Sequence, residues 1–326
     1  MKTRISEDPR LQAFGLLLVP AFVAHAIQML GEDRPWEPYA ASRYWYQPGW
    51  HLYLEPWVPV ALGVALVLGV LGLAVRRRRR WLAAIIALYW AHYLTFPFRI
   101  RNHMSHMFFG LTMLGAVWIA GRIQGDWRSR AVDRTAVTGL ALVLCTTYFF
   151  AGFHKTNTVF LSVSDASTAA SSITQFWIYA DLGSVPPVWV KWLAAYGTVF
   201  IECAVPWVAW RSERLRVWAL LTLMLFHYPM VSSLNVSDYP MIVSVSYPCL
   251  FSEAHFRAVI AHAGVSRWTV TGAVVGAAMQ VWAIPWWGDL TIFGIFVLGL
   301  WGWAAGAMLR ETLRPSMRET MAPASA

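Results

Sequence analysis

The sequence predicts an all-α fold, a polytopic bundle of transmembrane helices with about ten hydrophobic segments. Hydrophobic residues make up 58% of the 326 residues and charged residues only 13%, whereas soluble proteins carry about 25% charged residues. The apolar residues are gathered into stretches that approach the roughly 20 residues needed to cross a bilayer. Basic residues are concentrated in alternate connecting segments, which is typical of a multi-pass protein.

Ten candidate spans follow one another along the chain. They cover residues 11–30, 57–75, 81–98, 107–121, 135–153, 187–210, 217–235, 240–251, 268–286 and 290–309. The stretch 107–121 is short for a crossing, and 240–251 is too short to cross unaided, so it is tilted, re-entrant or joined to 217–235 by a break near Asp238-Tyr239-Pro240. The basic N-terminus resembles the start of a signal peptide, but no clear small-residue cleavage site follows, so we expect a retained first span.

The distribution of charge predicts that both termini are cytoplasmic. With the N-terminus inside and every segment crossing, 20 of the 26 basic residues fall on the inside, as the positive-inside rule requires. The six outside are Arg34, Arg43, Arg99, Arg101, Lys155 and Lys191. We therefore expect a cytoplasmic segment at 1–10, a transmembrane domain at 11–309 in which 240–251 crosses, and a cytoplasmic tail at 310–326.

The net charge of +9 does not indicate a nucleic-acid partner. Arg76–Arg80 form a run of arginines, and such runs can bind nucleic acid. This run lies between two apolar stretches, where a topology anchor is expected instead. We expect the aromatic segment 32–56 and the Ser/Thr/Ala-rich segment 156–186 at the outer interface, and a short interfacial helix at 253–266.

Several classes of protein are excluded by what the sequence lacks. Cys145, Cys203 and Cys249 lie far apart in apolar segments, so neither a disulfide framework nor a zinc site is expected. The motifs of Walker nucleotide sites, Rossmann folds, zinc proteases, serine hydrolases and c-type haem are absent. No internal repeat is evident, which argues against a transporter built from inverted repeats.

Lys155 is the first candidate for a catalytic residue. Arginine serves almost everywhere as the basic residue, and the chain has only three lysines. A lysine in this place suggests a titratable amine, because a desolvated lysine loses its proton more readily. The alternative is a lysine whose charge extends to the membrane surface.

Other polar residues lie at the depth of the membrane. Glu202 is mid-span and either relays protons, pairs with a group on another helix or forms a structural hydrogen bond. His227 also lies deep in a span, where helix packing is the commoner role. Arg99, His103 and His106 share one helical face, and two histidines at i and i+3 could share a metal. Without a nearby carboxylate or cysteine we expect no metal, but a polar helix end facing a pocket.

The residues Tyr148–Lys155, YFFAGFHK, resemble the Y-F-x-A-G-x-x-K stretch of the HTTM superfamily, which includes the vitamin K-dependent gamma-glutamyl carboxylase. Three further pieces are similar and stand in the same order. Asn102-His103 resembles the family's Asn-His-x-Tyr segment, Phe200–Trp207 its next span with an acidic residue, and Leu225–Phe251 its histidine-containing stretch. The resemblance covers about residues 80–255.

The resemblance implies a cofactor and an activity. In the carboxylase, a reduced vitamin K is deprotonated and oxygenated, and the resulting base removes a glutamate γ-proton before CO2 adds. The family's catalytic lysine corresponds to Lys155 and its histidine to His227. Two departures point to a divergent member, since Thr156–Val159 stands where the family has W-x-x-G and the large lumenal domain is missing.

The candidate site residues form two groups. The catalytic candidates are Lys155, His227, His103 and Glu202, and the cofactor-binding candidates are Tyr148, His106 and His154. The leading hypothesis is a quinol-dependent enzyme of a bacterial inner membrane, with a vitamin K-like reduced quinone as cofactor, Lys155 as base and membrane lipids as its surroundings. The alternatives are a non-catalytic membrane protein, for immunity or partner binding, and a transporter.

Overall fold

The computed structural model of the protein describes residues 5–32, 57–95, 102–162, 169, 173, 185–233, 238–283 and 288–313. All regular structure in these ranges is helical, which confirms the predicted all-α class. The chain forms two compact units, Met1–Glu253 and Ala254–Ala326. Residues 33–56 of the expected aromatic segment and most of 156–186 lie outside the described residues, as does most of the tail at 310–326.

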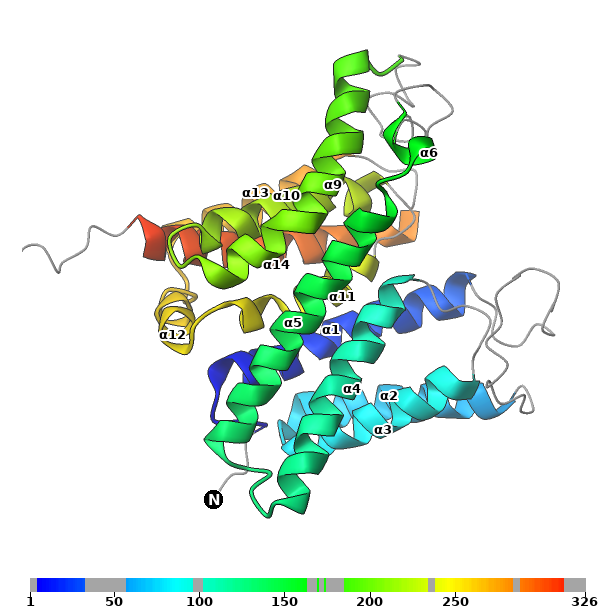
Figure 1. Cartoon of the computed structure of the whole chain (residues 1–326), viewed down its shortest axis with the longest axis vertical. Coiled ribbons are helices and arrows are strands. Elements are labelled where there is room, and N and C mark those ends of the chain that lie inside the picture. Colours follow the sequence, from blue (N-terminus) through cyan, green and yellow to red (C-terminus); the bar gives the residue numbers. More distant parts are fainter. Residues whose placement is uncertain are drawn as a thin grey trace, which may run out of the picture. The chain divides into compact units, whose positions relative to one another are not determined.

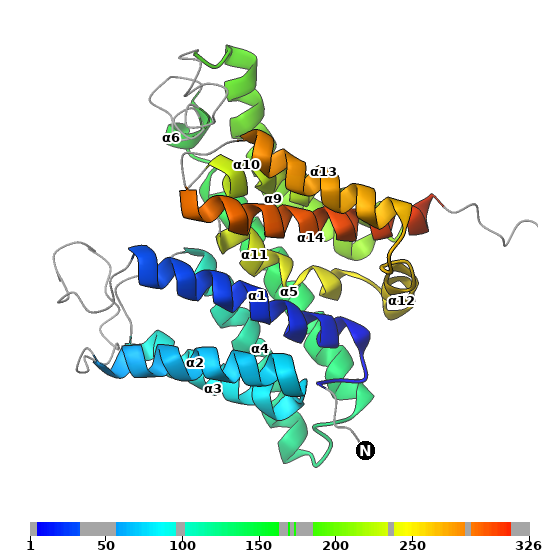
Figure 2. The same cartoon turned by 180° about the vertical axis from the view of Figure 1, so that it is seen from behind.

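The helices of the first unit follow the predicted spans with shifted ends. They are α1 (Pro9–Glu32), α2 (Trp57–Arg76), α3 (Arg79–Thr95), α4 (Asn102–Ile123), α5 (Arg130–His154), α6 (Thr158–Leu161), α9 (Val188–Arg211), α10 (Arg216–Ser233), α11 (Asp238–Ser244) and the 3-10 helix η3 (Tyr247–Leu250). Figure 1 shows α5 running beside α4, with which it is in contact, and α9 also packs against α5. Seen from behind, α1 lies over α2, and α2 lies beside α3 (Figure 2).

Three helices among the described residues are long and apolar enough to cross a membrane. They are His106–Ile123 within α4, Arg130–His154, which is α5, and Val188–Arg211, which is α9. Large apolar side chains such as Phe150, Trp189 and Phe200 are exposed along α5 and α9. An outward apolar surface is costly in water and suits contact with lipid, so the fold indicates association with a membrane.

The predicted crossing at 240–251 is not a continuous helix. The chain forms the seven-residue α11 and then η3, separated by a turn at Val245-Ser246. Seven residues of α-helix span about 10 Å, against about 30 Å for the hydrocarbon core of a bilayer. Almost every residue from Pro240 to Phe251 is buried, and irregular backbone is tolerated at membrane depth only where protein surrounds it.

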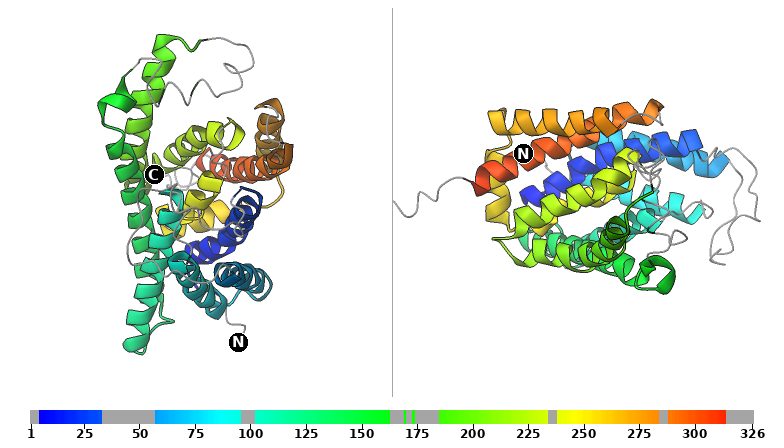
Figure 3. Two further views of the ribbon diagram at one scale, coloured as in Figure 1. Left: turned by 90° about the vertical axis from the view of Figure 1, so that its right-hand side faces the viewer. Right: turned by 90° about the horizontal axis from the view of Figure 1, so that it is seen from above.

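The second unit is built on one close pair of helices. α13 (Arg267–Ala283) and α14 (Gly288–Thr312) follow α12 (Glu253–Ala261), which corresponds to the short helix expected at 253–266. The right-hand view of Figure 3 shows α13 beside α14, with which it is in contact. Their backbones are in direct contact, since a Cβ added at Gly272 or Gly276 would overlap a carbonyl oxygen of α14. Small residues on facing helices allow this close approach in membrane proteins.

Candidate functional site

Helix α5 carries the polar side chains that define the candidate site. It begins after Ser129, whose side chain accepts a hydrogen bond from the backbone N–H of Val132, and it ends at His154 with Lys155 as its C-cap. Ser is a favoured N-cap because it satisfies an otherwise unpaired N–H. Tyr148 and Lys155 are seven residues apart, so they share a face of α5 about 10 Å apart along its axis.

Lys155 and Glu202 form an ion pair between α5 and α9. The Lys155 Nζ donates to Oε2 of Glu202 over 2.6 Å and also to the Ala151 carbonyl oxygen over 3.2 Å. The Glu202 side chain is 3% exposed, whereas that of Lys155 is 30% exposed. The sequence did not identify the residue on another helix that pairs with Glu202. In the structure that residue is Lys155, the first catalytic candidate.

A glycine lets the two helices approach closely at this pair. A Cβ added at Gly152 would lie 2.7 Å from Sγ of Cys203 and 3.0 Å from Cβ of Glu202, which is closer than van der Waals contact allows. Gly152 is one turn of helix from Lys155. The glycine of the YFFAGFHK stretch therefore sets the distance at which Glu202 meets the lysine.

A second polar cluster lies two turns along α5 and is fully buried. The Tyr148 hydroxyl is 2.5 Å from Nε2 of His227 on α10 and 3.0 Å from the hydroxyl of Tyr247 in η3. All three side chains are buried, and Tyr148 and His227 have no exposed surface. Buried polar groups need such partners because an unsatisfied one costs free energy, so Tyr148 joins three segments of the unit.

His106 belongs to a third group next to the second. Its Nδ1 is 3.3 Å from Oγ1 of Thr147 on α5, and its Nε2 is 3.2 Å from Oγ of Ser246, in the turn between α11 and η3. Both ring nitrogens of this buried histidine are thus within reach of a hydroxyl. The broken segment 238–250 supplies a side chain to each of the two buried clusters.

The remaining predicted residues are placed differently. His154 is exposed at the end of α5, and no hydrogen bond among the described residues joins it to Lys155, Glu202 or Tyr148. His103 lies in the first turn of α4, but its side chain is outside the described part of the chain. The described residues include no group of three potential metal ligands.

Sequence reasoning missed the partners that η3 and its preceding turn contribute. Tyr247 and Ser246 stand in a segment read only as a short span, and Gly152 was quoted only as part of a motif. Their signal was present, since two serines and a tyrosine interrupt the apolar run Met241–Leu250. Polar residues in such a run at membrane depth tend to hydrogen-bond to other helices.

The arginine run also contains a residue with a structural role. Arg79 is buried and pairs with Asp133 of α5, and it donates to the carbonyl oxygens of Ile5 and Trp127. Asp133 in turn accepts from the hydroxyl of Ser6. The neighbouring Arg76, Arg77 and Arg80 are exposed, as expected for a topology anchor. Arg79 instead ties the N-terminal segment to α3 and α5.

The arrangement can hold and move protons between helices. Lys155 presents an amine that solvent or lipid can reach, with a buried carboxylate directly behind it. The clusters around Tyr148 and His106 consist of hydroxyl and imidazole groups, each of which can both donate and accept hydrogen bonds.

Comparison with protein-family profiles, with curated proteins and with solved structures finds no match for this chain.

Proposed function

We propose that this chain is a divergent HTTM-type membrane protein that binds a reduced quinone and uses Lys155 as its base. The observation that carries the proposal is the Lys155–Glu202 ion pair, because both residues come from stretches that resemble the family. Ionisable residues at membrane depth are costly, usually pair with one another and tend to be functional. In this pair only the amine of Lys155 is exposed. A base that acts on an incoming ligand must be exposed in this way.

The surroundings of the lysine fit an aromatic, apolar ligand. Nζ of Lys155 is 6.0 Å from the centre of the Phe160 ring. Phe149, Phe150 and Phe153 on the last turns of α5 are exposed. Aromatic rings prefer offset or edge-to-face contacts with one another, so these side chains offer a surface on which a quinone ring and its apolar tail can lie.

The two charged residues would act together on one proton. A proton shared between Nζ and Oε2 removes both charges from a poorly solvated site, and the neutral amine is then free to act as a base. When Nζ accepts a proton from an acidic hydroxyl, Glu202 keeps the proton that it took from Nζ, and the oxygen anion left on the ligand balances the charge of the ammonium that forms. A bound reduced quinone would supply that hydroxyl and the electrons for reaction with dioxygen.

The proposal includes ten membrane segments, of which the broken stretch 240–251 crosses surrounded by protein, together with cytoplasmic termini and a bacterial inner membrane as the location. The excess of basic residues on one side supports this orientation. Single cysteines placed at Arg77 and at Asn157, in a chain whose three native cysteines are replaced, test it. A membrane-impermeant thiol reagent applied to intact cells should label the cysteine at 157 and not the one at 77, and the reverse labelling would refute the orientation.

The direct test is quinol binding and oxidation by the purified protein. Saturable binding, followed by absorbance of the quinone, should occur for the wild type, and oxidation should be lost in Lys155→Ala. The matched control is Arg134→Ala, which removes an exposed positive charge near the other end of α5 and should leave oxidation unchanged. Unchanged oxidation in a folded Lys155→Ala variant, or no binding by the wild type, would refute the proposal.

A second candidate is a non-catalytic membrane protein in which the pair only holds helices together. The observation that favours it is the tight contact of Gly152 with Cys203, since α5 and α9 are also packed closely beside the pair. This candidate predicts that Lys155→Ala lowers thermal stability without changing any activity, and that a partner protein co-purifies. Quinol oxidation that depends on Lys155 would exclude it.

A further inference from the structure

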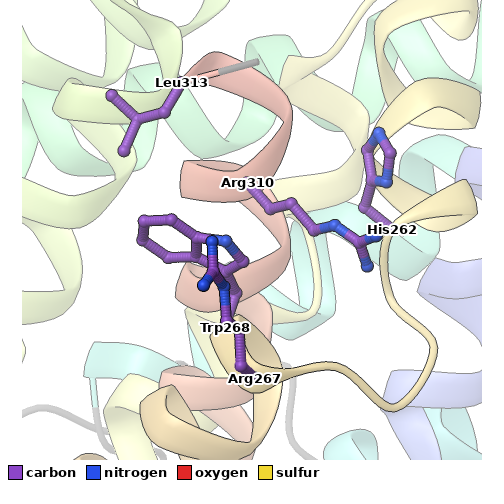
Figure 4. A pocket seen from close by; sticks show the side chains of 5 residues that line it. All are labelled: His262, Arg267, Trp268, Arg310 and Leu313. Atoms are coloured by element: carbon purple, nitrogen blue, oxygen red, sulfur yellow. The ribbon is translucent and has the colours of Figure 1, made fainter.

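The second unit contains a cavity at one end of its helix pair. The cavity has a volume of about 300 Å³ and is lined by His262, Arg267, Trp268, Arg310 and Leu313. Figure 4 shows these side chains, which come from the start of α13, the end of α14 and the residues directly after α12 and α14. Two of the five are arginines, and none is acidic.

The charges of the two arginines are not neutralised by the described part of the chain. Neither Arg267 nor Arg310 has a carboxylate partner there, and Arg267 instead lies over the Trp268 ring, 5.9 Å from its centre. The nearby carboxylate of Glu311 contacts His262 instead. Its Oε2 lies 2.9 Å from Nε2 of His262. Guanidinium groups bind phosphate through several donors at once, so the cavity is suited to a phosphate-bearing anion.

The position of the cavity favours a phosphate at a membrane surface. α13 and α14 coincide with predicted spans, and Val274, Val275 and Phe296 are exposed on their outer faces. Arg267 is the first residue of α13, and Arg310 is two residues from the end of α14. Tryptophan and arginine near the ends of spans lie at the depth of lipid headgroups, and Trp268 and Leu313 add an apolar wall beside the charges.

We propose that this cavity binds the phosphate of an anionic membrane phospholipid. Arg267 and Arg310 donate to the phosphate oxygens, while Trp268 and Leu313 contact the glycerol and the first part of the acyl chains. The site is separate from the Lys155–Glu202 pair and does not depend on the proposed enzymatic activity. A bound lipid would hold the ends of α13 and α14 at a fixed depth in the membrane.

Native mass spectrometry of the full-length protein, titrated with defined lipids, tests the proposal. The wild type should bind phosphatidylglycerol about tenfold or more tightly than phosphatidylcholine, because both lipids carry a phosphate but the choline ammonium is repelled by the two arginines, and one charge-assisted contact is worth about that factor. The double variant Arg267→Gln/Arg310→Gln should lose this preference. The control Arg122→Gln/Arg214→Gln removes the same charge from exposed arginines outside the cavity and should retain it.

Three results would overturn the proposal. The first is equal binding of both lipids by the wild type, a comparison that does not depend on any variant folding. The second is full retention of the preference in the cavity double variant. The third is binding of glycerol 3-phosphate as tight as that of the lipid, because the cavity would then be a site for a soluble phosphate ester.

Discussion

Nζ of Lys155 lies 2.6 Å from Oε2 of Glu202, and the two side chains of this pair are 30% and 3% exposed. The pair is therefore asymmetric. Glu202 depends on the lysine for neutralisation, whereas the lysine can still interact with its surroundings. Removing one partner of a buried pair leaves an uncompensated charge, which costs more than the pair itself contributes.

This asymmetry predicts an order of stabilities. Lys155→Ala should lower the free energy of unfolding by about 2 kcal/mol, less than the roughly 3–5 kcal/mol for a fully buried pair because the lysine is partly screened. Lys155→Ala/Glu202→Gln should be more stable than Lys155→Ala alone, since no bare carboxylate remains. Thermal unfolding in detergent measures both. A double variant less stable than the single one would contradict this account.

Gly152 should be intolerant of even a methyl group. In Gly152→Ala the new Cβ would lie 2.7 Å from Sγ and 3.1 Å from the backbone nitrogen of Cys203. Overpacking of this kind costs about 1–3 kcal/mol, and it would also lengthen the contact between Lys155 and Glu202. The same thermal unfolding assay should therefore report a loss of stability.

Gly197 on α9 provides the matched control for that substitution. A Cβ there would meet only the side chain of Leu193, at 3.6 Å, which is ordinary contact. Because alanine is favoured over glycine within a helix by about 0.5–1 kcal/mol, Gly197→Ala should be neutral or slightly stabilising. If the two alanine variants were equally stable, Gly152 would not set the distance between α5 and α9.

Tyr148 should be needed for its hydroxyl as well as for its ring. Tyr148→Phe leaves His227 and Tyr247 without the group that joins them, in a region with almost no exposed surface. An unsatisfied buried polar group costs about 1–3 kcal/mol. Tyr196→Phe, on an exposed residue stacked against Trp192, should have little effect in the same unfolding assay. A neutral Tyr148→Phe would show that the cluster contributes nothing to stability.

The helices could be predicted from the sequence far better than the site. Apolar stretches of the right length indicated the main helices with ends within about five residues, because a long uninterrupted apolar run is visible in the sequence itself. The pairing of Lys155 with Glu202 could not be predicted, since it depends on how α5 packs against α9. The sequence also did not show that 240–251 divides into two short helices at Ser246. A buried segment with a break in its helix and a short membrane-crossing helix have the same apolar composition.

Arg79 should be irreplaceable by lysine, unlike its neighbour Arg80. Arg79 reaches Asp133 and two backbone carbonyls at once, and its guanidinium lies 4.9 Å from the centre of the Trp118 ring. A lysine keeps the charge but lacks the planar fork that makes these contacts. Arg79→Lys should cost about 2 kcal/mol. Arg80→Lys changes an exposed residue and should stay within about 0.5 kcal/mol, and equal effects would contradict the structural role of Arg79.

The glycines between α13 and α14 should differ sharply in their tolerance of alanine. A Cβ at Gly272 would overlap the carbonyl oxygen of Gly302, which is backbone and cannot rotate away. At Gly299, by contrast, the nearest atom is the Ala273 carbonyl oxygen at 3.7 Å, an ordinary contact. Gly272→Ala must therefore separate the helices, whereas Gly299→Ala fits the space present.

Disulfide trapping can measure this separation directly. Cysteines introduced at Ala277 and Gly299, in a chain free of its native cysteines, should form a bond under mild oxidation, because a Cβ added at Gly299 would lie 3.9 Å from the Cβ of Ala277, within the roughly 3.5–4.5 Å that a disulfide spans. Adding Gly272→Ala should reduce the yield severalfold. The substitution Gly276→Ala, whose Cβ would overlap the Leu298 carbonyl oxygen, should act in the same way. An unchanged yield in both would mean that the helix pair is not held together by contact between backbones, and packing of the larger side chains would then have to stabilise it.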